Sequence, residues 1–404
     1  MANVSSSNGL EKRPKLRFPG FDEPWKETAL SSVLTERNEY AEKDGTYEHA
    51  TLSKEGIYGK TARYDRDFLV STENKKYKVT HLGDLCYNPA NLKFGVICLN
   101  TYGDAIFSPI YVTFEIDASS DPDFIGAYLT RWDFINRALK YQQGTVYERM
   151  AVSPEDFVSI KCCFPQKAEQ TRLAEFITLL DNRIAAQGKY VESLKKYKRG
   201  VVRTLLSPKH CSIKNVKWTT SRIGDIGTFI KGAPLSKADI SLEGTPFILY
   251  GELYTTYNEV ISNVVRKTQA SVDKQYYSQI GDVIIPTSGE TPEEISTASC
   301  VMLPDIILAG DLYIYRCTQV DGRIMSYILN HVVNDRIARV AQGKSIVHVQ
   351  AAELSKIEIT YPDLFSQKTI IAILAAISDR IDQGNAELRL LHELRKALLQ
   401  KLFI

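Results

Sequence analysis

The stretch Pro165-Gln166-Lys167-Ala168-Glu169-Gln170 begins a long helical pattern, and Pro362-Asp363-Leu364-Phe365-Ser366-Gln367 begins a second one 197 positions later. In both copies apolar residues recur at alternating steps of four and three, which is the period of a coiled-coil seam. Both copies lose the apolar residue at the same two places, Gln187 with Gly384 and Lys198 with Arg395. These matching interruptions indicate an internal duplication. The seam residues are Leu173, Ile177, Leu180, Ile184, Val191, Leu194, Val201 and Leu205, and then Ile370, Leu374, Ile377, Ile381, Leu388, Leu391, Leu398 and Leu402.

The composition is that of an ordinary globular protein. A chain of 404 residues is too long for a single ordinary core, so we expect two or more domains. Charged residues make up 24% and the net charge is only +2, so no whole-molecule field points to nucleic acid. The seven cysteines show no Cys-x-x-Cys spacing and the histidines are scattered, so we expect reduced thiols and no zinc site.

Neither the first residues nor any later stretch predicts insertion into a membrane. Met1 to Arg13 is polar and lacks the apolar centre of a signal peptide. Every apolar run is well short of the ~20 residues that a membrane helix needs. We therefore expect a cytoplasmic protein with no membrane partner.

Outside the helical copies, the two halves of the chain repeat one order of elements. Trp25 and Trp218 each precede an apolar segment, and Ile280-Gly281-Asp282-Val283 corresponds to Leu82-Gly83-Asp84-Leu85. Strands are expected at Leu82–Tyr87, Gly95–Leu99, Ile106–Ile116, Phe157–Phe164 and Ile306–Arg316, and amphipathic helices at Pro122–Leu139 and Met325–Val340.

This order predicts the domain organisation and the fold class. The narrow apolar stripe of each helix must be buried, and its own duplicate is the nearest candidate. We expect an α/β fold of the α+β kind, with two similar globular domains joined by two long helices in an antiparallel, pseudo-two-fold coiled coil. The alternative is that each helix packs only on its own domain. The expected segments are a disordered lead-in at 1–14, domains at 15–163 and 208–361, and spacer helices at 164–207 and 362–404.

Two similar domains joined by long helices suit a ligand that presents two sites along a line, and duplex DNA is the obvious one. The loops at Tyr250–Tyr257 and Thr287–Thr291 combine Gly with polar side chains that can contact phosphates or bases, although such loops are common. A basic run on the first helix fits phosphate contacts and, equally, the solvated flank of a coiled coil. This run comprises Lys189, Lys195, Lys196, Lys198, Arg199 and Arg203, opposed only by Glu192.

An ordered set of motifs covers nearly the whole chain. They are Leu16-Arg17-Phe18-Pro19 with Trp25, Ile248–Tyr254, Gly281–Pro286 with Ser288–Thr291, Ala341–Ser345, and the helices with Asp181, Arg183 and Ile184 and with Asp379, Arg380 and Ile381. The chain closely resembles the specificity subunit of type I restriction–modification systems. Each motif is loose by itself, but the set occurs in the order of that family: target-recognition domain, helix, target-recognition domain, helix.

The resemblance implies a function in DNA recognition. Each globular domain would read one half of a bipartite target in double-stranded DNA, and the helices would set the spacer between the halves. The helices would also dock two methyltransferase subunits, and restriction subunits would join that complex. S-adenosylmethionine, ATP and Mg²⁺ are expected on those partner subunits, and neither a cofactor nor a metal on this chain.

Site residues follow from the same resemblance. In the second domain the matching loops supply Tyr250, Gly251, Tyr254, Ser288, Gly289, Glu290, Thr291, Gln342, Gly343 and Lys344 as DNA-binding candidates. The first domain departs from the pattern, because Asn88-Pro89-Ala90-Asn91 stands where the second has Ser-Gly-Glu-Thr; its candidates are Asn88, Asn91, Gln143, Gly144 and Thr145. The candidates for subunit docking and spacing are Leu173, Ile177, Leu180, Ile184, Leu194, Ile370, Leu374, Ile377, Ile381 and Leu391.

The sequence lacks the motifs of adenine methyltransferases and of P-loop ATPases. Asn88-Pro89-Ala90 lacks the second proline and the aromatic residue of an adenine methyltransferase loop, and no P-loop pattern occurs. Glu358 and Asp363 could suggest a nuclease carboxylate pair, but an acidic residue beside a helix start is ordinary. We therefore expect a non-catalytic subunit with no catalytic residues. The rival hypothesis is a coiled-coil scaffold that bridges protein partners without reading DNA.

Overall fold

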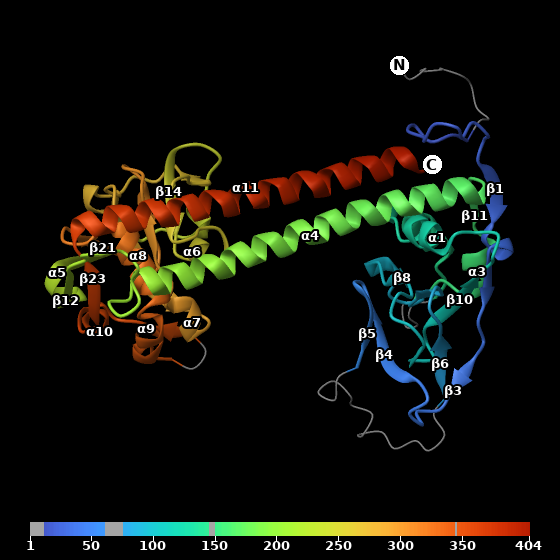
Figure 1. Ribbon diagram of the computed structural model, residues 1–404, viewed down its shortest axis with the longest axis horizontal. Coiled ribbons are helices and arrows are strands. Elements are labelled where there is room, and N and C mark those ends of the chain that lie inside the picture. The colour runs from blue at the N-terminus through green and yellow to red at the C-terminus, as the bar shows by residue number, and fades with distance from the viewer. Residues whose placement is uncertain (1–11, 61–75, 145–149, 344–345) are drawn as a thin grey trace. The chain divides into compact units, whose positions relative to one another are not determined.

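The computed structural model in Figure 1 describes residues 12–60, 76–144, 150–343 and 346–404. The chain divides into two compact units. Unit 1 comprises residues 1–186 and 388–404, and unit 2 comprises residues 187–387. Each unit therefore holds one globular part, the beginning of one long helix and the end of the other.

The globular part of unit 1 is built from β-sheets covered by short helices. A four-stranded sheet has the order β2-β10-β7-β8, a five-stranded sheet has the order β3-β6-β9-β4-β5, and β1 pairs with β11. Its helices are α1 (Pro122–Leu129), α2 (Trp132–Ala138) and α3 (Pro154–Ser159). Its strands are β1 (Lys26–Ala29), β2 (Leu34–Glu36), β3 (Tyr40–Ala41), β4 (Glu48–Ser53), β5 (Gly56–Gly59), β6 (Tyr77–Thr80), β7 (Leu85–Tyr87), β8 (Ile97–Leu99), β9 (Ala105–Phe107), β10 (Val112–Ile116) and β11 (Lys161–Phe164).

Unit 2 has the same kind of architecture. Its sheets have the orders β13-β21-β17-β19-β15, β16-β14-β20, β12-β23 and β18-β22. Its helices are α5 (Ile223–Ile226), α6 (Glu252–Thr255), α7 (Pro292–Ile295), α8 (Gly322–His331), α9 (Asn334–Val340) and α10 (Ala351–Ser355). Its strands are β12 (Trp218–Arg222), β13 (Gly227–Lys231), β14 (Thr245–Leu249), β15 (Val260–Ile261), β16 (Arg266–Thr268), β17 (Asp282–Pro286), β18 (Ser288–Gly289), β19 (Ser299–Val301), β20 (Ile307–Ala309), β21 (Leu312–Cys317), β22 (Val347–His348) and β23 (Glu358–Pro362).

The pairing of the strands shows that the two units share one topology. The order β2-β10-β7-β8 in unit 1 corresponds to β13-β21-β17-β19 in unit 2. The parallel pair β4–β9 corresponds to the parallel pair β14–β20. The strand that precedes each globular part, β1 or β12, pairs with the strand that precedes the long helix, β11 or β23. The duplication predicted from the helices therefore extends through the globular parts.

Several expected elements are shorter than their sequence patterns. The expected strand Ile106–Ile116 is two strands, β9 and β10, which belong to different sheets. Each long amphipathic pattern is two helices, α1 with α2 and α8 with α9. The expected strand Phe157–Phe164 begins as α3 and is extended only from Lys161, because Ser153 caps the helix by accepting a hydrogen bond from Asp156 N. Apolar spacing marks which residues are buried, but it does not show where the chain turns.

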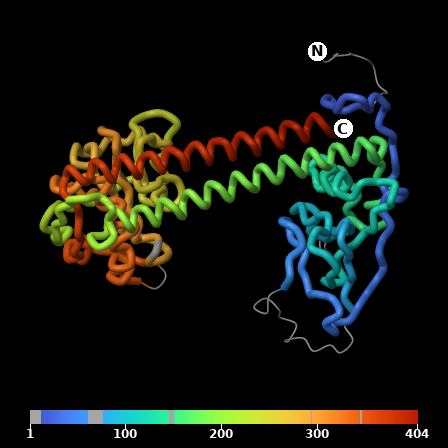
Figure 2. The backbone as a smooth tube through the Cα atoms, viewed as in Figure 1, coloured from blue at the N-terminus to red at the C-terminus, as the bar shows by residue number. Residues whose placement is uncertain are grey.

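The two long helices are α4 (Lys167–Leu205) and α11 (Leu364–Leu402), each of 39 residues. In unit 1 the start of α4 shares a core with the end of α11, which includes Leu173, Ile177 and Leu402. In unit 2 the end of α4 shares a core with the start of α11, which includes Leu205 and Ile370. The helices are therefore antiparallel in each unit, as Figure 2 shows for the segments of each unit. Every predicted seam position is buried or half-buried.

These contacts confirm the predicted fold class: two similar α+β globular parts and two long antiparallel helices with an internal repeat. The helix candidates Leu180, Ile184, Leu194, Ile377 and Leu391 are half-buried, and Leu173, Ile177, Ile370, Leu374 and Ile381 are buried. The segment boundaries expected from the sequence stay a prediction, and residues 1–11 of the expected lead-in lie outside the described residues.

The first matching interruption of the seam marks a close contact between the helices in unit 2. Gln187 Nε2 donates to the backbone oxygen of Gly384 at 3.1 Å. A Cβ atom on Gly384 would lie 2.9 Å from Val191 Cγ2, so the helices approach too closely there for a side chain. Because Gln187 and Gly384 are equivalent in the repeat, each position faces its own copy.

A buried glutamine at the start of each long helix connects that helix to its globular part. Gln367 Nε2 donates to the Pro362 oxygen at 2.8 Å, and Gln367 Oε1 accepts from Asp321 N at 2.8 Å. The residues Gln170, Pro165 and Asp121 form the same two bonds in unit 1, both at 2.9 Å. Asp121 and Asp321 are the N-cap residues of α1 and α8. We call this arrangement the glutamine bridge.

Replacing the bridge residue with an isosteric apolar one should destabilise unit 2. Gln367→Leu removes both hydrogen bonds and leaves the Asp321 N–H and the Pro362 carbonyl without partners. We expect the free energy of unfolding to fall by about 2 kcal/mol, measured by urea denaturation. Gln383→Leu on the exposed face of α11 is the matched control, with an expected change within about 0.5 kcal/mol. Equal effects of the two changes would contradict a structural role for the bridge.

Candidate nucleic-acid interface

Three loops that the sequence singles out lie together in unit 2. Strands β18 and β22 pair antiparallel, with Ser288 opposite His348. The Tyr254 hydroxyl donates to the Ser288 carbonyl oxygen at 2.6 Å. Gln342 and His348 exchange two backbone hydrogen bonds of 2.9 and 2.7 Å. The structure thus joins the predicted segments Tyr250–Tyr254, Ser288–Thr291 and Gln342–Gly343 into one surface, which we call the unit 2 loop surface.

The candidate residues on the unit 2 loop surface differ in exposure. Ser288 and Gly289 are buried, Tyr250, Gly251 and Tyr254 are half-buried, and Glu290, Thr291, Gln342 and Gly343 are exposed. Lys344, which the sequence also predicts, lies outside the described residues. Burial raises the pKa of the Tyr254 hydroxyl, which therefore stays protonated and donates to Ser288 at neutral pH. Exposed and buried members accordingly have different tasks: the exposed ones can meet a ligand, and the buried ones hold the loops.

Ser288 lies between two polar side chains. Its hydroxyl is 3.0 Å from His348 Nδ1 and 3.3 Å from Asp311 Oδ2. An ionised carboxylate only accepts, so the hydroxyl donates to Asp311 and His348 Nδ1–H donates to the hydroxyl. A catalytic triad needs the histidine between the serine and the acid. Because the serine occupies the central position here, this set positions side chains and does not form a nucleophile.

A glycine turn carries Gln342 and Gly343 onto the same surface. Gly343 has φ +138°, and a Cβ atom there would lie 1.9 Å from the Ile346 oxygen, so only glycine fits. Unit 1 repeats the turn at Gly144, which has φ +149°. Gln143 exchanges two backbone hydrogen bonds of 2.9 Å with Ala151, as Gln342 does with His348. The predicted correspondence of these two turns is confirmed.

The counterpart loop of unit 1 has the same backbone position and different side chains. Val152 N donates to the Pro89 oxygen at 3.3 Å, as Val349 N does to the Thr287 oxygen at 3.1 Å. Asn88 is buried and its Oδ1 accepts from Ala90 N at 3.1 Å, so this candidate shapes the turn. The candidates Asn91, Gln143 and Gly144 are exposed, and Thr145 lies outside the described residues.

A cavity of about 620 Å³ adjoins the unit 2 loop surface. It lies beyond the carboxyl ends of the parallel strands β14 and β20, where Tyr250, Gly251, Gly310 and Asp311 line it. The buried Glu252 carboxylate holds the loop by accepting from Leu249 N at 3.1 Å and from Arg266 Nε at 2.9 Å. Lys237 also lines the cavity.

Three residues of this region are not among the candidates predicted from the sequence: Asp311, His348 and Arg266. Asp311 is 23 residues from Ser288 and His348 is 60 residues from it, so no local spacing connects them. One feature of the sequence could have pointed to Asp311. The sequence Ala309-Gly310-Asp311 ends an apolar strand with a glycine, and Gly310 has φ +82°. Such a turn at a strand end commonly presents a polar side chain.

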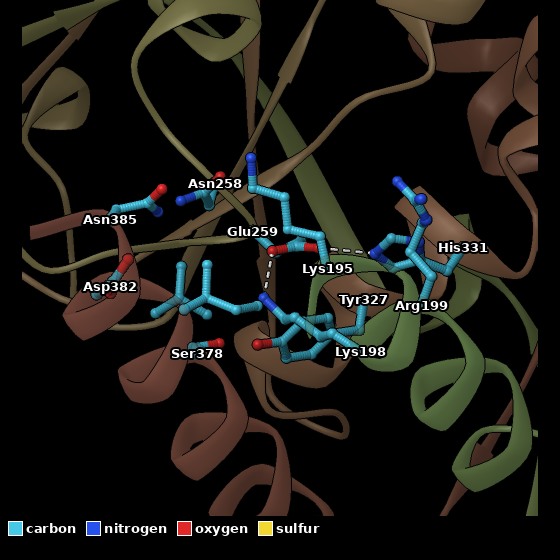
Figure 3. Close-up of a pocket in the computed structure, with 12 residues that line it drawn as sticks. Lys195, Lys198, Arg199, Asn258, Glu259, Tyr327, His331, Ser378, Asp382 and Asn385 are labelled. Atoms are coloured by element: carbon cyan, nitrogen blue, oxygen red, sulfur yellow. Dashed lines mark hydrogen bonds and ion pairs between the residues drawn. The ribbon is translucent and has the colours of Figure 1, made fainter. Parts of the chain in front are cut away.

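A second polar cluster ties α4 to the globular part of unit 2 (Figure 3). Glu259 accepts from Lys198 Nζ at 2.8 Å and from His331 Nε2 at 2.7 Å. Burial would raise the pKa of Glu259, but the hydrogen bond from His331 and the charge of Lys198 lower it to about 2. Lys195 pairs with Glu192 at 2.8 Å. Glu192 is thus the acidic residue within the basic run, and Glu259 from the globular part pairs with Lys198, which is half-buried.

Of the two residues considered for a nuclease pair, Asp363 caps the start of α11 and Glu358 lies in β23. Asp363 Oδ1 accepts from Phe365 N and from Ser366 N, both at 3.1 Å, and Oδ2 accepts from Lys217 N at 3.0 Å. These backbone donors lower the pKa of Asp363 to about 2. Within the described residues, no group of three or more His, Cys, Asp or Glu side chains could hold a metal ion. Among the same residues, no helix has the length and apolar character needed to cross a membrane.

Comparison with known proteins agrees with this geometry. Residues 215–390 match the model of the type I restriction modification DNA specificity domain. The chain is 24% identical over 293 residues to the putative type I restriction enzyme MjaX specificity subunit of Methanocaldococcus jannaschii, with 68% of this chain covered. It is 24% identical over 195 residues to the MjaVIII specificity subunit of the same organism, with 46% covered. In these segments the chain is similar to the specificity subunits of type I restriction enzymes. The alignments span 66% and 42% of those two relatives.

A solved structure shows the same fold as this chain. The S subunit of the type I restriction–modification system from M. genitalium aligns with a TM-score of 0.59 at 16% identity. The alignment covers 97% of this chain and 99% of that chain. Both curated relatives are named specificity subunits of type I restriction enzymes.

The cluster of Glu259, Lys198 and His331 gives the stability of unit 2 a defined pH dependence. The pKa of Glu259 falls from an ordinary 4.5 to about 2 on folding, so its contribution is complete above pH 4.5 and is lost as pH falls towards 2. We expect Glu259→Gln to lower the free energy of unfolding by about 3 kcal/mol at pH 7, and by much less at pH 3.

Glu192→Gln is the matched control, because Glu192 is an exposed residue of α4 that pairs only with the nearby Lys195 among its described contacts. It should change unfolding little at either pH. Urea denaturation of both variants at pH 7 and pH 3 provides the measurement. A loss for Glu259→Gln that is the same at both values would show that the carboxylate charge does not stabilise unit 2.

Proposed function

We propose that this chain is the specificity subunit of a type I restriction–modification system. It would read a bipartite target in double-stranded DNA, with one half-site read by the globular part of each unit. The main support is that both units carry the same fold and place different side chains at its corresponding turns. A duplicated frame with diverged loops suits two different half-sites. Base readout needs side chains that reach the groove edges, and both loop regions offer exposed polar residues.

The residues proposed to contact DNA are the loop candidates predicted from the sequence. Exposed members such as Glu290, Thr291 and Gln342 would contact DNA directly, and buried members such as Ser288 and Asn88 would act by shaping the loops. Gly251 would allow close approach of the backbone, and the half-buried Tyr250 and Tyr254 are proposed contacts beside it. The remaining proposed members are Gly289, Gly343, Lys344, Asn91, Gln143, Gly144 and Thr145.

The long helices are proposed to set the distance between the half-sites and to dock two methyltransferase subunits. A helix of 39 residues is about 60 Å long. Restriction subunits would join through the methyltransferase subunits. S-adenosylmethionine, ATP and Mg²⁺ would belong to those partners, and the complex would work in the cytoplasm, where the DNA lies. Residues Leu173, Ile177, Leu180, Ile184, Leu194, Ile370, Leu374, Ile377, Ile381 and Leu391 are proposed for spacing and docking.

DNA selection by the full chain tests this function directly. The chain, with its methyltransferase subunits, should enrich duplexes with two short conserved blocks and an unspecified gap of fixed length. Binding to such a duplex should weaken by roughly 0.9 log units per log unit of salt for each phosphate neutralised. A scaffold that bridges proteins would enrich no sequence and would show no such salt dependence, and that result would overturn the proposal.

A longer helix pair should lengthen the preferred gap. One heptad inserted before Val191 and its equivalent inserted before Leu388 keep the seam in register in both helices. The insertion adds about 10 Å, which corresponds to roughly three base pairs. We expect the enriched gap to grow by that amount while both conserved blocks stay the same.

The control carries the heptad in α4 alone, which puts the two seams out of register and should abolish selection of the split target. An unchanged gap in the doubly extended chain would show that the helices do not set the distance.

A further inference from the structure

The carboxylate of Asp311 is exposed and yet held in place. It follows Gly310 in the turn between β20 and β21, and Ser288 donates to its Oδ2 at 3.3 Å. Its backbone oxygen accepts from Thr287 N at 2.8 Å. Ser288 is itself buried and is fixed by His348 and by Tyr254. An aspartate that served only solubility would not need hydrogen bonds that fix its position.

Asp311 also lies at the edge of a cavity. It lines the cavity of about 620 Å³ together with Tyr250 and Gly251, on the unit 2 loop surface. A Cβ atom on Gly310 would lie 3.1 Å from Tyr250 Cδ1, so the tyrosine ring lies against the turn that carries Asp311. The carboxylate and the ring therefore border the same recess.

Glu252, the other acidic residue that lines the cavity, already accepts hydrogen bonds within the protein. Glu252 uses one carboxylate oxygen for Leu249 N and the other for Arg266 Nε. Asp311 makes one side-chain hydrogen bond among the described residues, through Oδ2. A carboxylate has room for about four hydrogen bonds, so Asp311 can accept another one from a ligand. Lys237 and Arg266 line the same cavity, and Arg266 is paired with Glu252.

The chemistry of DNA limits what such a carboxylate can contact. Phosphates repel it, and DNA offers few hydrogen-bond donors. In the major groove the donors are the exocyclic amino groups, cytosine N4 and adenine N6. We propose that Asp311 reads one base of the half-site of unit 2 by accepting a hydrogen bond from the amino group of a cytosine or an adenine. Ser288 is the positioning residue that aims the carboxylate. This inference rests on the proposed function and adds to it the class of base and the residue that reads it.

The test is the same DNA selection with the full chain and two variants. Asp311→Asn replaces an acceptor with an amide that both donates and accepts, so the preference for an amino base should fall about tenfold at one position. Ser288→Ala keeps the Asp311 carboxylate but removes the hydrogen bond that positions it. The preference at that same position should therefore weaken to a smaller degree. Asp273→Asn, a change of an exposed aspartate of unit 2, is the matched control and should alter no position.

The half-site of unit 1 serves as an internal control for folding, because it should be selected unchanged by every variant. The enriched base distinguishes cytosine from adenine. Retention of every wild-type preference by Asp311→Asn overturns this inference and leaves the proposed function intact. Loss of the whole unit 2 half-site in both variants assigns the pair a structural role and also overturns it. A wild-type chain that selects no split target overturns both proposals together.

Discussion

The glutamine bridge is the constraint on which each unit depends. The N–H at the cap of α1 or α8 and the carbonyl of Pro165 or Pro362 lie where two elements meet, and regular helix bonding satisfies neither. An uncharged amide can accept from one and donate to the other with a single side chain. An amide one methylene shorter would have less reach. The presence of the same residue with nearly equal distances in both units shows that the attachment of helix to globular part is a fixed feature of the duplicated element.

This attachment explains how the rest of each unit can vary. The bonds that build the loop region are largely between backbone atoms, such as Val349 N to the Thr287 oxygen and Val152 N to the Pro89 oxygen. Backbone bonds do not specify side chains, so Asn88 can shape a turn in unit 1 where β18 pairs with β22 in unit 2. A conserved frame with replaceable loops is the arrangement that lets one fold accept different ligands at equivalent surfaces.

The sequence was sufficient for the features that depend on period and repetition. The heptad spacing predicted both long helices, and the matched interruption at Gln187 and Gly384 is the position where the helices touch. Features that depend on distant contacts were not accessible. Asp311 acquires its role from Ser288, and the breaks after α1 and α8 depend on packing that apolar spacing does not encode. The acidic residue predicted as the mate of Asp181, Asp379, is one position out of register; the strict equivalent of Asp181 is Ser378.

That difference of one residue accounts for an asymmetry between the units. The second interruption of the seam is Arg395 in α11 and Lys198 in α4. In unit 1 Arg395 forms a two-point ion pair with Asp181, so the charge connects one long helix to the other. In unit 2 the position equivalent to Asp181 is Ser378, which offers no charge, and Lys198 pairs with Glu259 of the globular part. Each cation, Arg395 partly exposed and Lys198 largely covered, pairs with the carboxylate that the local sequence provides. The two copies share one topology but hold their long helices by different ion pairs. Duplication therefore preserved the backbone arrangement and not the pairing of the charged side chains.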